Sequence, residues 1–112
     1  MSDEEKKYLT DIFTAIESID FHIGKKKIFN EYINNKTIRR AVERELEIIG
    51  EATGRLLKLN PDINISYARV IVDLRNKVIH AYDEVNHMVL WKIIIKDLPV
   101  LKSEVSKLLI DH

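Results

Sequence analysis

The sequence predicts an all-α fold, a bundle of four to five helices. Three observations favour it: apolar residues recur three and four positions apart along most of the 112 residues, only three glycines and two prolines interrupt them, and 46% of the residues are hydrophobic. We therefore expect one domain over residues 1–112. A chain of this length buries roughly two-thirds of the surface that it exposes when unfolded. The remaining apolar surface favours a homodimer.

The first two helices are expected before residue 34. Ser2 can cap the first helix and form a capping box with Glu5, and Gly24 ends it. A shorter helix is expected at about 26–33, before the turn signal of Asn34 and Asn35. The apolar face of the first helix consists of Leu9, Ile12, Phe13, Ile16, Ile19 and Ile23.

Three further helical stretches complete the expected bundle. Pro61 ends the third helix, and Ser66 can cap a fourth helix that is apolar around most of its circumference and should be the most buried. A last stretch covers about 85–110, where Pro99 either bends one helix or opens a separate one. The apolar face of the third helix consists of Ile38, Val42, Leu46, Ile49, Thr53 and Leu56.

Charge and composition exclude several classes of protein. Eighteen basic residues balance eighteen acidic ones, so the net charge argues neither for nor against nucleic-acid binding. Residues 24–44, however, carry seven basic and two acidic residues, which indicates either a solvated helix face or a patch that faces phosphate.

The absence of cysteine excludes disulfides and cysteine nucleophiles and fits the cytoplasm. The acidic N-terminus is no secretory signal, and no apolar run is long enough for a membrane span.

The histidines and aromatic residues outside the fourth helix are expected to have structural roles rather than roles in metal binding or base stacking. His22, His87 and His112 have no second ligand at a suitable spacing, so we expect surface or capping roles, no metal site and no cofactor. Four aromatic residues lie within or beside apolar stripes and are expected in the core rather than stacked on bases. They are Phe13, Phe21, Phe29 and Trp91.

Polar residues interrupt the apolar fourth helix and carry the main functional signal. Arg75 must pair with an acid, reach solvent or face a cavity that receives an anion. On a regular helix Arg75 and His80 lie about 140° apart, whereas Arg75 and Tyr82 share a face. Either the helix ends near His80 and the backbone turns this side chain inward, or two copies of the motif meet across a dimer interface.

The pattern Arg-x4-His-x-Tyr, formed by Arg75, His80 and Tyr82, follows a long helix that reads VERELEIIGEATGRLL. Together with the C-terminal segment DEVNHMVLWKIIIKDLPVLKSEV, it resembles the HepT-like group of the HEPN superfamily. The resemblance covers most of the chain. One modest departure is Tyr67, where related chains often carry a tryptophan.

The resemblance implies the toxin of a HEPN/MNT toxin–antitoxin module, a homodimeric, metal-independent endoribonuclease whose two motifs face one cleft. It further implies a nucleotidyltransferase antitoxin that neutralises the toxin by attaching AMP to Tyr82. RNA supplies its own nucleophile, the ribose 2′-hydroxyl. The His80 imidazole can accept that proton or donate one to the 5′-oxygen, and Arg75 can hold the phosphate. Asn76 could orient the imidazole or contact the phosphate.

Alternative interpretations stay open. Lys25, Lys26 and Lys27 could contact RNA or the antitoxin, or could be solvated lysines at the start of a helix. The chain could be a non-catalytic module that binds nucleotide or docks the nucleotidyltransferase, with Arg75 as a phosphate anchor. The polar cluster could also be a purely structural network that fixes the register of the bundle.

Overall fold

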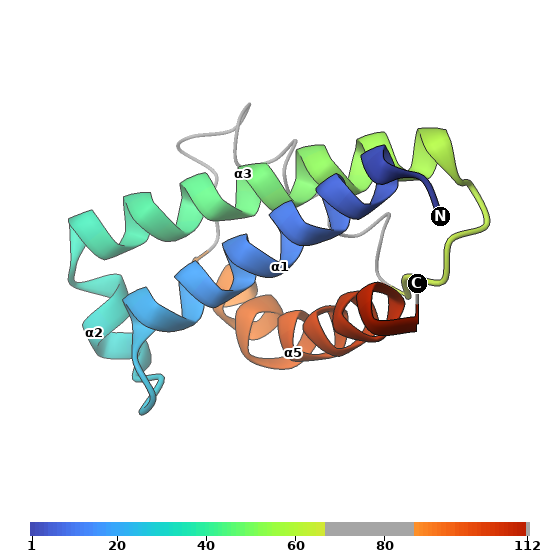
Figure 1. Cartoon of the computed structure of the whole chain (residues 1–112). Helices are drawn as coiled ribbons and strands as arrows, with labels where there is room; N and C mark the ends of the chain where they lie inside the picture. The colour runs from blue at the N-terminus through green and yellow to red at the C-terminus, as the bar shows by residue number, and fades with distance from the viewer. Residues whose placement is uncertain (67–86, 112) are drawn as a thin grey trace.

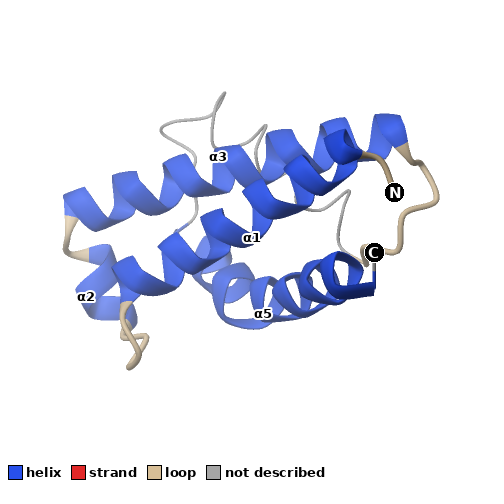
Figure 2. Cartoon of the chain, in the orientation of Figure 1, coloured by secondary structure: helices blue, strands red, loops and turns tan. Residues whose placement is uncertain are grey.

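The computed structural model describes residues 1–66 and 87–111. In these ranges the chain forms four helices and no strand (Figures 1 and 2). Helix α1 contacts both α3 and α5, and the short α2 packs against α3. The predicted all-α bundle is confirmed. The helices are α1 (Asp3–Ile23), α2 (Phe29–Ile33), α3 (Lys36–Leu59) and α5 (His87–Asp111).

Both predicted ends of α1 are confirmed. The Ser2 hydroxyl accepts a hydrogen bond from the Glu5 amide at 3.1 Å, and the Gly24 amide closes the helix on the Asp20 carbonyl. The capping box differs in one detail, because the Glu5 carboxylate accepts from the Ser2 hydroxyl at 3.2 Å. Gly24 has φ +76° and ψ 169°, a backbone conformation that essentially only glycine adopts.

Helix α2 is shorter than predicted. It begins at Phe29 rather than near residue 26, because residues 24–27 form a turn in which Lys27 also adopts a positive φ of 50°. The three lysines of this turn are exposed and lie before the helix rather than in its first turn. Arg39 donates a hydrogen bond to the carbonyl of Ile33 and so attaches α3 to the end of α2.

Helix α3 begins and ends at the predicted signals. The Asn35 side chain accepts from the Ile38 amide at 3.0 Å, and the helix ends at Leu59, two residues before Pro61. Its predicted stripe is buried from Val42 to Leu56, with Ile38 half-buried at the first turn. The stripe includes Thr53, a fully buried residue whose hydroxyl has no hydrogen-bond partner in the described part of the chain.

Helix α5 is one continuous helix, and Pro99 lies inside it. This excludes the alternative in which Pro99 opens a separate helix. Its buried face packs into the core shared with α1 and α3. The buried residues of α5 are Leu90, Ile94, Leu98, Leu101 and Val105.

One aromatic prediction is wrong. Phe13, Phe29 and Trp91 pack against the core, whereas the Phe21 side chain is 83% exposed. The reason is angular: Phe21 lies two residues, or about 200°, beyond the buried Ile19 on the same helix. Its ring meets only the edge of His22 among the ring contacts in the described ranges.

The fourth predicted helix, which would follow Ser66, lies outside the described residues, as does His112. None of the described helices combines the length and the apolar character that crossing a membrane requires.

Candidate functional site

The three predicted motif residues, Arg75, His80 and Tyr82, lie in the segment 67–86, outside the described residues, and so does the secondary candidate Asn76. The structure does describe the residues at both ends of this segment, Ser66 and His87. Each of them is attached to a distant helix, and these attachments set where the segment begins and ends.

At the N-terminal end, Ser66 is held by the carboxylate of Glu104 on α5. The Ser66 amide donates to both carboxylate oxygens at 3.2 Å, and the Ser66 hydroxyl donates to one of them at 2.6 Å. Hydrogen bonds to an ionised acceptor are stronger than neutral ones. The hydroxyl predicted to cap the fourth helix therefore donates to α5 in this structure.

At the C-terminal end, His87 is held by Tyr32 of α2. The phenol oxygen and the His87 Nδ1 atom are 3.3 Å apart, and the two rings meet edge to face. Tyr32 also contacts the rings of Phe29 and Trp91. His87, predicted as a surface or capping residue, is instead half-buried and hydrogen-bonded, which the prediction missed because its partner is 55 residues away.

Burial keeps the Tyr32 phenol neutral. Only 1% of the residue is exposed. Desolvation, with a smaller contribution from the nearby Glu43 carboxylate, raises the pKa of Tyr32 to about 12, against an opposing effect of Arg39. At neutral pH the phenol is protonated and can donate to Nδ1 when that nitrogen carries no proton.

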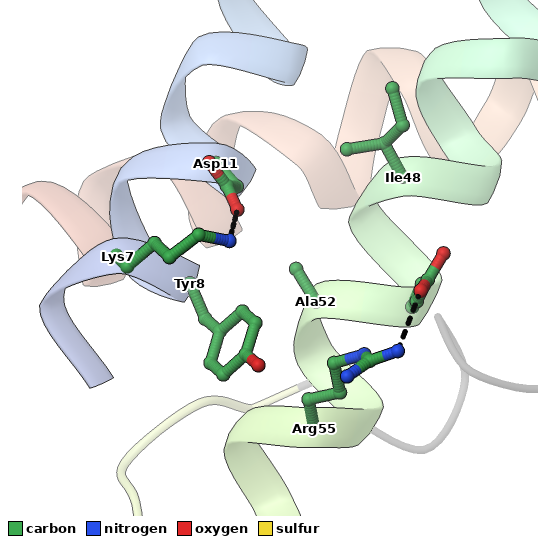
Figure 3. Close-up of a pocket in the computed structure, with 7 residues that line it drawn as sticks. Lys7, Tyr8, Asp11, Ile48, Ala52 and Arg55 are labelled. Carbon is green, nitrogen blue, oxygen red and sulfur yellow. Dashed lines mark hydrogen bonds and ion pairs between the residues drawn. The ribbon is translucent and has the colours of Figure 1, made fainter. Parts of the chain in front are cut away.

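A pocket between α1 and α3 has a volume of about 360 Å³ and balanced charges (Figure 3). Its two cations are each paired with a carboxylate one helical turn away on their own helix. Lys7 pairs with Asp11 and Arg55 with Glu51, both at 3.2 Å. The pocket therefore offers a ligand no surplus charge.

A second pocket, the α1/α5 pocket, has a volume of about 470 Å³ and surplus positive charge. Its lining contains the ammonium groups of Lys27 and Lys102 and one carboxylate, that of Asp20. Only Lys102 pairs with this carboxylate, at a distance of 3.5 Å. Lys27, one of the three predicted patch lysines, forms no ion pair within the described ranges. The walls of the pocket include Phe13, Asp20, Lys27, Pro99, Lys102 and Ser106.

Sequence reasoning missed Lys102 and Asp20 because they lie 82 residues apart and only the packing of α1 on α5 joins them. No group of three or more His, Cys, Asp or Glu side chains in residues 1–66 and 87–111 is arranged to hold a metal ion.

The helices and their packing define an all-α, HEPN-like bundle. The chain belongs to the HepT-like ribonuclease family, since the family model described as "Ribonuclease HepT-like" matches residues 12–108. The resemblance predicted from the sequence is thereby confirmed. The matched range includes the positions of all three motif residues and of Asn76.

Curated relatives agree with this family. The chain is 40% identical to "Putative RNase MJ1380" of Methanocaldococcus jannaschii, over 90% of this chain and 93% of the relative. It is 38% identical to "Probable ribonuclease HepT" of Thermococcus cleftensis, over 96% of this chain and 98% of the relative. No solved structure matches the chain at a significant level.

Proposed function

We propose that this chain is a metal-independent endoribonuclease and the toxin of a HEPN/MNT toxin–antitoxin module in the cytoplasm. The observation that carries the proposal is the family match over residues 12–108, which spans Arg75-x4-His80-x-Tyr82. The names of the relatives, which describe RNases, support the same activity.

In the proposed reaction, His80 removes the proton of a ribose 2′-hydroxyl, and the resulting oxygen attacks the adjacent phosphorus. The bond from phosphorus to the 5′-oxygen breaks, and an imidazolium returns a proton to that oxygen. The products are a 2′,3′-cyclic phosphate and a 5′-hydroxyl. Arg75 stabilises the charge on the phosphate with its planar set of donors, and Asn76 orients the imidazole or contacts the phosphate.

A homodimer completes the proposed site. Arg75 and His80 lie about 140° apart on a regular helix, so two copies of the motif across a dimer interface would supply the guanidinium and the imidazole together. The three exposed lysines at 25–27 are proposed contacts for RNA or for the antitoxin.

Inhibition is proposed to act at Tyr82. The phenol oxygen attacks the α-phosphate of ATP on the nucleotidyltransferase antitoxin, AMP is attached, and pyrophosphate leaves. On a regular helix Tyr82 shares a face with Arg75, so the attached phosphate would pair with the guanidinium and its bulk would block the cleft. Tyr82→Phe should keep cleavage but escape modification, which intact-mass measurement after co-production with the antitoxin detects as the missing AMP.

The central experiment is RNA cleavage in excess EDTA. The wild-type protein should cut the RNA, and the His80→Ala and Arg75→Ala proteins should not. Both variants should melt at the wild-type temperature, so that the loss of cleavage is not a loss of folding. His22→Ala is the matched control, because it removes an imidazole on α1 and should leave cleavage unchanged. Cleavage that stops in EDTA contradicts metal independence. Nucleotide binding that survives His80→Ala, with no cleavage by any form, supports the non-catalytic alternative.

A further inference from the structure

The α1/α5 pocket contains a side-chain set that the proposed chemistry does not use. It joins residues from three parts of the chain: Phe13 and Asp20 of α1, Lys27 of the turn after α1, and Lys102 of α5. Its volume of about 470 Å³ lies in the range of pockets that enclose small organic ligands.

Lys102 is held in this pocket and keeps donors free. Its ammonium lies 3.5 Å from the Asp20 carboxylate and 5.6 Å from the centre of the Phe13 ring. The first distance is longer than the 2.7–2.9 Å of a strong charge-assisted hydrogen bond. The ammonium has three N–H donors, so the loose pair with Asp20 leaves donors for an anion.

Lys27 adds a second positive charge to the same pocket. The turn that ends α1 gives Lys27 its positive φ of 50°, and its side chain lines the pocket together with Lys102. Two ammonium groups against one carboxylate leave a surplus positive charge, whereas the pocket between α1 and α3 is neutral.

The remaining walls fit an ester of phosphate better than a bare anion. Ser106 brings a hydroxyl, while Phe13 and Pro99 bring apolar surface. A phosphate linked to a sugar and a base offers groups to all of them: charge for the lysines, polar oxygens for the serine, and a flat apolar face for Phe13 and Pro99.

We propose that the α1/α5 pocket binds one nucleotide unit of an RNA strand, with its phosphate between Lys27 and Lys102. This rests on the proposed function, because RNA is the substrate named there. The pocket extends the 25–27 lysine patch across to α5, and Asp20 holds the Lys102 ammonium in place when no phosphate is bound. A free nucleotide shares this chemistry, so the experiment separates the two sources.

The test measures binding of a fluorescently labelled single-stranded RNA oligonucleotide by anisotropy, in EDTA, with the full-length His80→Ala protein as background. Lys102→Met removes the charge and keeps an unbranched apolar side chain beside Phe13. At 0.1 M salt the loss of one phosphate contact should weaken binding about fivefold and reduce the slope of log affinity against log salt by about 0.7. Lys27→Asn should act alike, since asparagine tolerates a positive φ.

Two further variants show whether weaker RNA binding arises merely from a loss of folding or from the lower net charge of the protein. Lys107→Met makes the same charge change at an exposed position of α5, about 140° around the helix from Lys102, and should change affinity less than twofold. Asp20→Asn removes the competing carboxylate and should tighten binding, which a poorly folded protein would not do.

Equal weakening by Lys102→Met and Lys107→Met would overturn the proposal, as would no change in either. AMP serves as the second probe: AMP binding that Lys102→Met abolishes, with RNA affinity unchanged, overturns the assignment to an RNA strand. If the wild-type protein cuts no RNA but its RNA affinity still depends on Lys102, the ribonuclease proposal falls and the pocket proposal stands.

Discussion

The Tyr32→Phe substitution should lower stability at neutral pH and raise it relative to wild type at high pH. The change removes only the phenol oxygen, which lies 3.3 Å from the His87 Nδ1 atom. The ring and its contacts with Phe29 and Trp91 remain. The loss of one such hydrogen bond, with its partner left half-buried, should cost about 1 kcal/mol of unfolding free energy.

The pH dependence follows from the raised pKa. The phenol has a pKa of about 10 when the chain is unfolded and about 12 when it is folded. As pH rises through this window, the unfolded chain loses the proton first, so unfolding becomes easier for the wild type. The lost stability reaches about 1.4 kcal/mol at pH 11. Because a phenylalanine side chain cannot ionise, the variant escapes this loss, and the two stabilities should cross between about pH 10.5 and 11.

Urea unfolding of both proteins between pH 8 and 11 measures this difference. The other titrating groups are common to the two proteins, so their effects cancel in the comparison. The wild type should be more stable by about 1 kcal/mol at pH 8 and less stable by a few tenths of a kcal/mol at pH 11. A difference that stays constant over this range would refute the reasoning, because it would mean that the folded protein ionises Tyr32 as easily as the unfolded chain.

Substitutions at three other positions test the fold. Thr53→Val removes a buried hydroxyl that has no partner in the described ranges and should raise the unfolding free energy by about 1 kcal/mol; a lower melting temperature would contradict this. Gly24→Ala should cost about 1–3 kcal/mol of unfolding free energy in urea, because φ +76° with ψ 169° is a backbone conformation that essentially only glycine adopts, while the space around a new Cβ is open. Gly24→Asn should cost as much, because the positive φ that asparagine tolerates goes with a ψ near +47°, and a Gly24→Asn protein as stable as the wild type would contradict this. Glu104→Gln should weaken the attachment of Ser66 and destabilise by about 1 kcal/mol, and an unchanged urea midpoint would count against it.

Local signals predicted the helix ends well where one side chain or one backbone angle sets them. In the structure, as predicted, α1 begins after the Ser2 cap and ends before Gly24, and α3 ends two residues before Pro61. The predicted start of α2 is wrong because lysines 25–27 have good helix propensity. The positive φ of Lys27 keeps them in a turn, and no pattern in the sequence indicates it.

Long-range contacts explain most of what the sequence did not reveal. His87 looked isolated because its partner Tyr32 is 55 residues away. Lys102 and Asp20 are 82 residues apart and meet only because α1 packs on α5. Neither pair has a spacing pattern that periodicity can detect. The motif Arg75-x4-His80-x-Tyr82, in contrast, is contiguous in the sequence and could be found there, and its geometry stays a prediction.

The two attachments at the ends of the segment 67–86 bear on how variants of the proposed enzyme are interpreted. Glu104 holds Ser66, and Tyr32 holds His87, while neither Glu104 nor Tyr32 belongs to the motif. A variant at either position would therefore change cleavage by displacing an end of the segment, and a conservative replacement that restores the hydrogen bond should restore the rate. A group that exchanges protons with RNA has no such substitute, because the imidazole's own pKa is part of its chemistry. Recovery by conservative replacement thus separates residues that position the segment from residues that carry the reaction.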